Sequence, residues 1–310
     1  MGIMKNEIKV HRFTVSIVCG CGENGESIYE DSGVLMLPSS YCENGTPTTL
    51  VISCHGAGGT VETDDSQIEV QTFIKYLLAN GYAIMDVNGL PKEYAQVMGI
   101  DIRNNIGSPI ALQSYVKAYH YCIENFNLRK EVFVHGGSMG GISSTNLVLS
   151  QQIPVIAQSG FCPVLDTYNQ IFLHPWSKGL PKTALGIFYS LEKDGSGEYI
   201  YDEEKVNGFN PMARCELVNG KESISYPVPV KFWHCEDDDI VNIEVTKRFV
   251  AAVCNAGGIA HLKTFPVGRH EPQDYGMPVE APEGQCELNG EMLVIRPAIE
   301  EAFLWISSFA

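Results

Sequence analysis

One short segment combines a serine with the glycines that a nucleophilic serine requires. Residues 131–141 read EVFVHGGSMGG and continue into ISSTNLVLS. This order predicts a strand, a tight Gly-x-Ser-x-Gly turn and a helix, the setting in which such a serine acts as a nucleophile. Gly136 and Gly140 leave room for a turn so sharp that Ser138 is held in a strained backbone conformation. The pattern therefore predicts acyl transfer at Ser138. The alternative is a glycine-rich connection whose serine only caps a helix.

The sequence HGGSMGG after a buried strand, with the elements around it, resembles the α/β-hydrolase superfamily. The resemblance spans about residues 33–308, and it is strong at the turn and loose over 161–226. It implies that the nucleophile, the acid and the histidine of a catalytic triad follow one another along the chain. The remaining two members are therefore expected downstream of Ser138.

A serine hydroxyl is a weak nucleophile at neutral pH and needs an imidazole to take its proton. The resemblance implies a base in the loop after the last strand, where FPVGRHEP contains His270. His261 lies near the start of that strand, at the opposite edge of the sheet, and is interpreted as structural. We predict His270 as the base, the alternative being a histidine of a surface loop.

The acid is expected in the loop after the preceding strand, within VPVKFWHCEDDDIVN. The family pattern, set against residues 234–241, selects Asp238 as the acid and leaves Asp237 as the second choice. Cys235 stands where the family usually has glycine. The other acidic residues of the run are expected to be solvated. We expect no metal on them, because adjacent side chains diverge and no second set of ligands is found. No cofactor is predicted.

The oxyanion of an acyl transfer needs backbone amides that point at it. The resemblance implies one donor in the amide of Met139, at the start of a helix whose dipole adds to the effect. Residues 49–59 read TLVISCHGAGG and resemble the family's His-Gly oxyanion loop. That match implies the amide of Ala57 as the second donor, with that of Gly58 as the alternative. A phosphate loop is the alternative, but the lysine of a Walker motif is missing.

Apolar runs rich in β-branched residues alternate with helical patterns, which predicts a parallel sheet with crossover helices. We expect strands near 10–19, 33–37, 49–54, 82–87, 131–135, 154–158, 228–234 and 261–266, and helices over 65–80, 108–126, 139–151, 243–257 and 294–307. The runs at 49–54, 82–87 and 131–135 are apolar nearly throughout, as in central strands covered on both faces. The first two strands should form an antiparallel edge. The predicted fold class is α/β, with the α/β-hydrolase fold.

The regular alternation of strand and helix patterns stops between Phe161 and about Tyr226, where aromatic residues, prolines and glycines are scattered. This segment is interpreted as an insertion. We predict a core formed by 1–160 and 227–310, with 161–226 as a cap over the site. Four residues are expected to bind substrate: Trp176, His174 and Phe172 from the insertion, and Tyr94 from the loop 89–108. The aromatic residues could equally form the core of a small cap.

Composition excludes some functions. A formal net charge of -16 makes nucleic acid an improbable partner. No stretch of 18 apolar residues and no signal sequence are found, so we expect a cytoplasmic protein without a membrane partner. The ten cysteines are scattered through apolar segments and are expected to be mostly reduced thiols. The sequence is compatible with a homo-oligomer as well as with a monomer.

Three functions are compatible with these residues. The first is an esterase that acts on a small-molecule ester through an acyl-enzyme. The second is a serine peptidase resembling the prolyl-oligopeptidase branch. About thirty residues precede the first core strand, fewer than the propeller of such peptidases requires, which favours the esterase. The third is a binding protein that keeps the fold without the activity.

Overall fold

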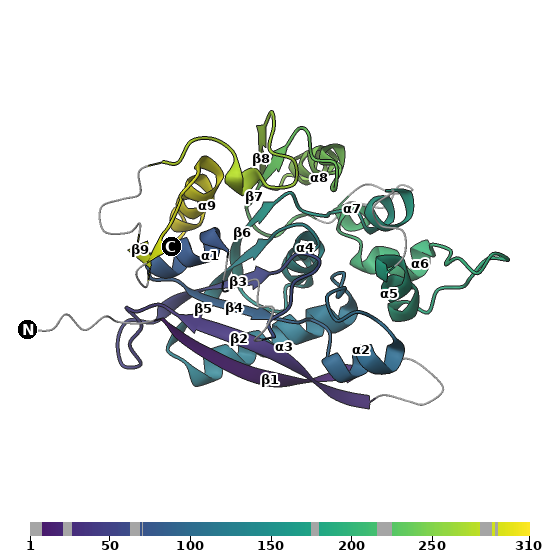
Figure 1. The fold of residues 1–310 in the computed structure, drawn as a ribbon, viewed down its shortest axis with the longest axis horizontal. Helices are drawn as coiled ribbons and strands as arrows, with labels where there is room; N and C mark the ends of the chain where they lie inside the picture. Colours follow the sequence, from purple (N-terminus) through teal and green to yellow (C-terminus); the bar gives the residue numbers. More distant parts are fainter. Residues whose placement is uncertain are drawn as a thin grey trace, which may run out of the picture.

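An eight-stranded sheet forms the centre of the molecule, in the order β1-β2-β4-β3-β5-β6-β7-β8 (Figure 1). The computed structural model describes residues 8–20, 27–62, 69, 71–174, 180–215, 225–279, 287–288 and 291–310. The strands of the sheet are β1 Lys9–Cys19, β2 Ser27–Leu37, β3 Thr48–Cys54, β4 Ala83–Val87, β5 Leu128–Gly136, β6 Val155–Phe161, β7 Val230–Cys235 and β8 Ala260–Phe265. β2 pairs antiparallel with β1 and with β4, and the other neighbours are parallel. The predicted antiparallel edge is confirmed.

Helices cover both faces of the sheet, which explains why its central strands are apolar along their whole length. The helices flanking the sheet are α1 Thr72–Ala79, α2 Lys92–Met98, α3 Pro109–Asn125, α4 Gly140–Ser150, α8 Ile243–Asn255 and α9 Pro297–Ser307. In β3, Leu50 and Ile52 join the core under α3, α4 and α8, whereas Val51 joins the core under α1 and α9. Each such side chain stabilises the fold by about 1.5–3 kcal/mol when it is buried.

The long crossover helices begin where the sequence provides a cap. The Ser108 side chain accepts a hydrogen bond from the Ala111 amide at 3.2 Å, and Pro109 follows at the first helical position. The Asn242 side chain accepts one from the Glu244 amide at 3.0 Å at the start of α8. These caps place both helix starts within one residue of the prediction.

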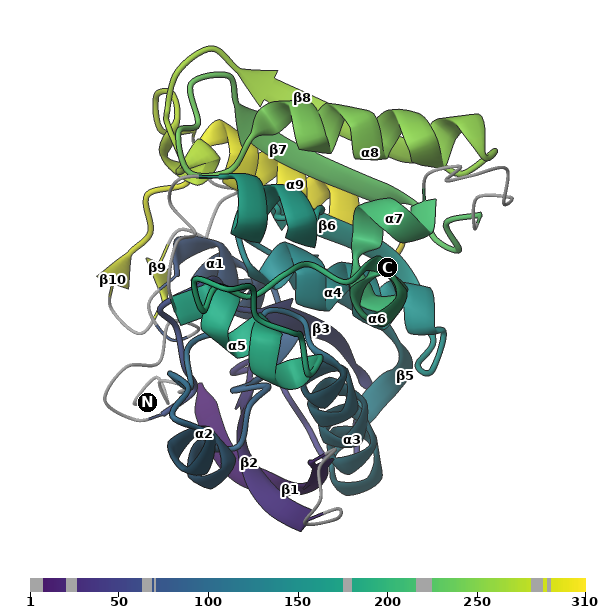
Figure 2. The same ribbon diagram turned by 90° about the vertical axis from the view of Figure 1, so that its right-hand side faces the viewer.

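The segment between β6 and β7 folds into short helices that lie on the α4 side of the sheet. These are η2 Asn169–Leu173, α5 Leu180–Phe188, α6 Glu203–Val206, η4 Asn207–Phe209 and α7 Pro211–Cys215. Leu165 and Leu185 belong to the same core as α3, α4 and α8, and the Asn146 side chain of α4 donates to the Phe209 carbonyl at 2.8 Å. In Figure 2, α5, α6 and α7 lie on the side of the molecule that faces the viewer, away from α1 and α9.

Some elements differ from the prediction. The helix expected over 65–80 begins at Thr72, and residues 63–68 and 70 lie outside the described residues. The segment 89–108 contains α2, which is too short for its periodicity to be recognised. A 3-10 turn, η5 Pro272–Asp274, and a two-stranded pair, β9 Glu287–Leu288 with β10 Glu291–Met292, precede α9. Among the described residues, no helix combines the length and the apolar character that crossing a bilayer requires.

Candidate active site

Ser138 lies between the carboxyl end of β5 and the start of α4, in a left-handed backbone conformation with φ of 52°. Such a conformation costs a non-glycine residue on the order of 1–3 kcal/mol. The glycines on either side make the turn possible, because a Cβ at Gly136 would collide with the Gly140 carbonyl and a Cβ at Gly140 would collide with the Cys54 carbonyl. The Ser138 amide donates to the Phe161 carbonyl of β6 at 3.0 Å. The hydroxyl is therefore held at the carboxyl edge of the sheet.

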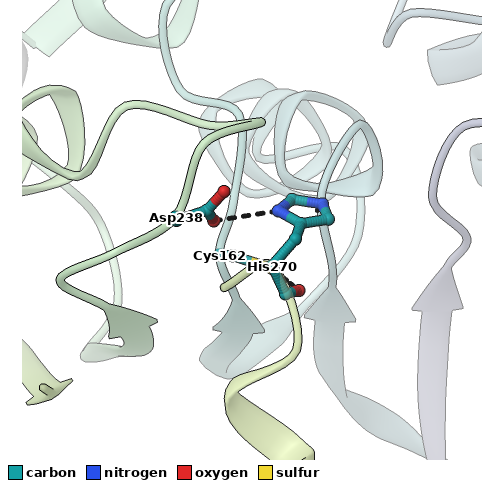
Figure 3. Close-up of side chains that lie close together, drawn as sticks. All are labelled: Cys162, Asp238 and His270. Carbon is teal, nitrogen blue, oxygen red and sulfur yellow. Dashed lines mark hydrogen bonds and ion pairs between the residues drawn. The ribbon is translucent and has the colours of Figure 1, made fainter. Parts of the chain in front are cut away.

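The three predicted triad residues form a continuous chain of hydrogen bonds. Ser138 Oγ lies 2.9 Å from His270 Nε2. The other ring nitrogen, Nδ1, lies 2.9 Å from Asp238 Oδ2. Figure 3 shows Asp238 and His270 facing each other from the loops that follow β7 and β8. Residues separated by up to 132 positions along the chain are thus brought together at one edge of the sheet.

The surroundings of Asp238 keep its carboxylate ionised and oriented. Its side chain is fully buried. Oδ1 accepts hydrogen bonds from the amides of Ile240 and Val241, both at 2.9 Å. Burial alone would raise the pKa of Asp238, but hydrogen bonds from His234, His270 and the Val241 amide outweigh it and hold the pKa below its usual range. A charged Asp238 can therefore fix the His270 ring and stabilise the imidazolium.

His234 is a second histidine on the same carboxylate, and the sequence did not identify it as such. Its Nε2 lies 3.0 Å from Asp238 Oδ2 and 3.2 Å from the Val241 carbonyl. Two acceptors face this nitrogen, so it carries the proton, and Nδ1 accepts from the Thr246 hydroxyl at 3.0 Å. His234 thus holds Asp238 through Oδ2, the same carboxylate oxygen that His270 contacts.

The other two aspartates of the run have different surroundings. Asp237 is exposed, and its Oδ1 accepts a hydrogen bond from the Arg269 amide at 2.7 Å. This bond holds the loop next to His270 without contact to the ring. Asp239 is exposed to solvent. Of the three, the structure brings Asp238 to the histidine.

Two backbone amides are available as oxyanion donors. Met139 is the N-cap residue of α4, and Ala57 follows β3 in the loop beside Ser138. Throughout the described part of the chain, neither amide donates to another group. Gly56 approaches the nucleophile so closely that a Cβ on it would lie 3.4 Å from Ser138 Cβ. Gly58 has a φ of 86°, and Ala57 rather than Gly58 lines the cavity at Ser138.

A cavity of about 460 Å³ opens at Ser138. It is lined by the turns that carry Ser138 and His270, by the loop after β3, by the end of β6, by the start of α1 and by the segment after His270: Cys54, Gly56, Ala57, Gln71, Thr72, Phe73, His135, Gly137, Ser138, Phe161, Cys162, His270, Glu271, Gln273 and Asp274. Glu271 and Asp274 are carboxylates, and among the described residues no lysine or arginine lines this cavity. His135 is buried, which lowers its pKa to about 3 and keeps it neutral.

Three of the four residues predicted to bind substrate are described, and none of these three is among the residues that line the cavity. Tyr94 is a core residue, 7% exposed, and packs against Tyr29. Phe172 packs against Tyr168 and Tyr201 within the insertion.

His174 follows η2 and is half-buried, while Trp176 lies outside the described residues. Neither Tyr94, Phe172 nor His174 is among the residues that line the cavity. Phe172 belongs to the insertion, which packs on the α4 side, and Tyr94 is held in the core against Tyr29, whereas the start of α1 lines the cavity.

Cys162 is a cavity residue that the sequence analysis did not identify. It directly follows β6, and its Sγ lies 3.8 Å from His270 Nε2. Because the carboxyl ends of neighbouring parallel strands meet at one edge, its position after a strand could have indicated this location. Burial holds the pKa of the Cys162 thiol well above its usual range. The thiol is therefore neutral and does not compete with Ser138 as a nucleophile. Within the described ranges, Cys162, Asp238 and His270 are the group whose atoms could hold a metal ion.

No protein-family model and no curated protein sequence matches the chain. Solved structures are similar to it. Acylaminoacyl peptidase from Pyrococcus horikoshii has a TM-score of 0.62 at 14% identity, over 86% of this chain and 38% of its own. Dipeptidyl peptidase 4 from Porphyromonas gingivalis has a TM-score of 0.55 at 14% identity, over 86% of this chain and 33% of its own. One of two fungal esterases from Rhizomucor miehei has a TM-score of 0.59 at 15% identity, over 98% of this chain and 84% of its own.

The chain has the α/β-hydrolase fold. It spans less than two fifths of the length of the two peptidases and most of the length of the esterase. In an α/β-hydrolase fold, the carboxyl ends of the parallel strands gather at one edge. Ser138, Asp238 and His270 follow β5, β7 and β8 at this edge.

Proposed function

We propose that this protein is a serine hydrolase that cleaves carboxylic esters through an acyl-enzyme. The observation that carries the proposal is the unbroken chain from Ser138 Oγ through the His270 ring to Asp238, with 2.9 Å at each step. The strained conformation of Ser138 adds to it, and so do the amides of Ala57 and Met139, which donate to no other group among the described residues.

The geometry supports a stepwise acyl transfer. Ser138 Oγ attacks the ester carbonyl while His270 Nε2 takes its proton, and Asp238 stabilises the imidazolium through Nδ1. The amides of Ala57 and Met139 donate to the oxyanion, at the positive end of α4. His270 then returns the proton to the leaving alcohol. A water molecule, activated by the same ring, hydrolyses the acyl-enzyme and regenerates the serine.

Similarity to a solved esterase supports an ester as the substrate, because it extends over most of both chains. The likeness to the Rhizomucor miehei esterase covers 98% of this chain and 84% of that one. A peptidase is the second candidate, because peptidases from Pyrococcus horikoshii and Porphyromonas gingivalis share the fold. The chemistry at Ser138 is the same for both, so the substrate has to separate them.

A fluorophosphonate probe and a substrate panel test the proposal. Wild type is expected to be labelled at Ser138 and to hydrolyse acetyl, butyryl or feruloyl esters, with neutral esters preferred over anionic ones because Glu271 and Asp274 line the cavity. Prolyl amides run beside them report peptidase activity. Cleavage of amides without ester hydrolysis would replace the esterase by the peptidase. Absence of labelling would leave only a binding protein.

A further inference from the structure

Cys162 lies beside the catalytic base, although acyl transfer has no role for a thiol. Its amide donates to the Trp233 carbonyl of β7 at 2.8 Å, and its backbone has a left-handed φ of 38°. The thiol donates to the His270 carbonyl at 3.1 Å. Its side chain is therefore held between the backbone and the ring of His270, on the wall of the cavity at Ser138.

The spacing of these atoms suits a metal ion. In tetrahedral zinc sites the bond lengths are about 2.3 Å to sulfur and about 2.0–2.1 Å to nitrogen, which puts the two ligand atoms about 3.6 Å apart. Cys162 Sγ and His270 Nε2 are 3.8 Å apart. The two atoms need to move by only a few tenths of an ångström to share one ion.

The neighbouring groups complete such a site. A metal-bound histidine commonly donates its other N–H to a carboxylate, which fixes the ring. Asp238 already accepts from His270 Nδ1 at 2.9 Å and lies next to Cys162 and His270 in Figure 3. Ser138 Oγ, 2.9 Å from Nε2, and water are available as further oxygen ligands.

From this geometry we infer that Cys162 Sγ and His270 Nε2 form a binding site for a thiophilic divalent cation such as Zn²⁺, and that its occupation switches the hydrolase off. On binding, the metal–sulfur bond forms as the S–H bond breaks and the proton leaves to solvent. The metal takes the Nε2 lone pair that would otherwise accept the proton of Ser138. Only the inhibitory consequence rests on the proposed function, because binding needs no turnover.

Binding is tested first, without substrate, using Co²⁺ and Zn²⁺ as probes. Co²⁺ added to metal-free wild type should produce a near-ultraviolet thiolate-to-cobalt absorption band, and Zn²⁺ should abolish it. Cys162→Ser should lose the band and bind Zn²⁺ at least about tenfold more weakly. His270→Gln keeps the cysteine and should also bind at least about tenfold more weakly, so the test does not depend on one variant folding.

The matched control is Cys254→Ser, which removes an exposed thiol outside the cavity and should bind both ions like wild type. Equal Zn²⁺ affinity in wild type, Cys162→Ser and His270→Gln would overturn the site. So would a cobalt band that disappears in Cys254→Ser.

Inhibition is tested on ester hydrolysis, with each variant compared with its own metal-free rate. Zn²⁺ should inhibit wild type and Cys254→Ser, a chelator should restore the rate, and Mg²⁺ should have no effect. Cys162→Ser should need at least about tenfold more Zn²⁺ for half inhibition. Unchanged inhibition in this variant would refute the switch. Failure of the proposed function would appear differently, as missing ester hydrolysis in metal-free wild type with the cobalt band intact.

Discussion

Two of the histidine–aspartate pairs at the carboxyl edge of the sheet, His270–Asp238 and His55–Asp86, differ in the group that faces the second ring nitrogen. His270 Nδ1 is 2.9 Å from Asp238, and His55 Nδ1 is 3.1 Å from Asp86. The other nitrogen of His270 faces the hydroxyl of Ser138 at 2.9 Å. That of His55 faces the side-chain amide of Asn105 at 3.4 Å.

Solvent access separates the pairs as well. The side chain of His270 is 15% exposed and that of His55 only 1%. Asp86 also accepts hydrogen bonds from the Tyr115 hydroxyl and the Val87 amide, both at 2.8 Å. We call His55 and Asp86 the sealed pair. It joins the end of β3, just before Ala57, to β4 and α3. An imidazole–carboxylate pair thus becomes a candidate catalyst where a nucleophile and a cavity meet it, and a structural brace where they do not.

The largest effect is expected from removal of the nucleophile that distinguishes the first pair. Ser138→Ala should lower kcat for an ester by at least about 10³-fold, because no other group can form the acyl-enzyme. Steady-state kinetics and loss of fluorophosphonate labelling measure this. Near-normal turnover would show that the first pair is no more catalytic than the second.

A smaller but still severe loss is expected from Asp238→Ala, which leaves His270 without its carboxylate. We expect kcat to fall by at least about 100-fold, though less than in Ser138→Ala. Asp239→Ala should behave like wild type. Asp237→Ala removes only the acceptor of the Arg269 amide and should cost far less than the central aspartate. A deeper loss at 237 or 239 than at 238 would reassign the acid.

The sealed pair should affect activity by positioning Ala57, without taking part in the reaction itself. His55→Ala leaves Asp86 buried with one partner fewer, which should destabilise the fold by about 1–3 kcal/mol. It should also lower kcat by about 10- to 100-fold, because Ala57 is no longer held toward the oxyanion.

A phosphonate transition-state analogue distinguishes the two effects, since its affinity should fall along with kcat. His261→Ala, an exposed histidine on β8, serves as the control and should change neither. A His55 variant that loses stability but keeps kcat would reduce this pair to a purely structural role.

The smallest effect is expected near the sealed pair, on the pH dependence of stability. Burial raises the pKa of Asp31 to about 7, although hydrogen bonds from Ser114 and the Gly89 amide oppose the shift. The folded state then holds a proton that the unfolded state releases, so stability should fall as the pH rises from about 4 to about 7.

Asp31→Asn should flatten the dependence, because the amide side chain has no proton to release in this range. Urea unfolding of both proteins at several pH values measures it. Parallel pH profiles for wild type and variant would contradict a protonated Asp31.

The sequence by itself determined what depends on neighbours along the chain. A β-branched apolar run, two small glycines and a helical pattern are enough to predict the turn at Ser138. The same local signals predict the sheet strands, the crossover helices and the antiparallel edge. The side chains of Ser108 and Asn242 cap their helices by bonding to amides no more than three residues ahead, so the starts of these helices could also be predicted from the sequence.

Only the tertiary structure decided what depends on contacts between distant segments. Asp237, Asp238 and Asp239 have the same side chain, and the loops after β7 and β8 bring Asp238 to His270. The insertion folds onto α4, because its apolar residues find their core there, and Phe172 goes with it. Cys162 and His270 are 108 residues apart, and they meet because parallel strands end at one edge of the sheet.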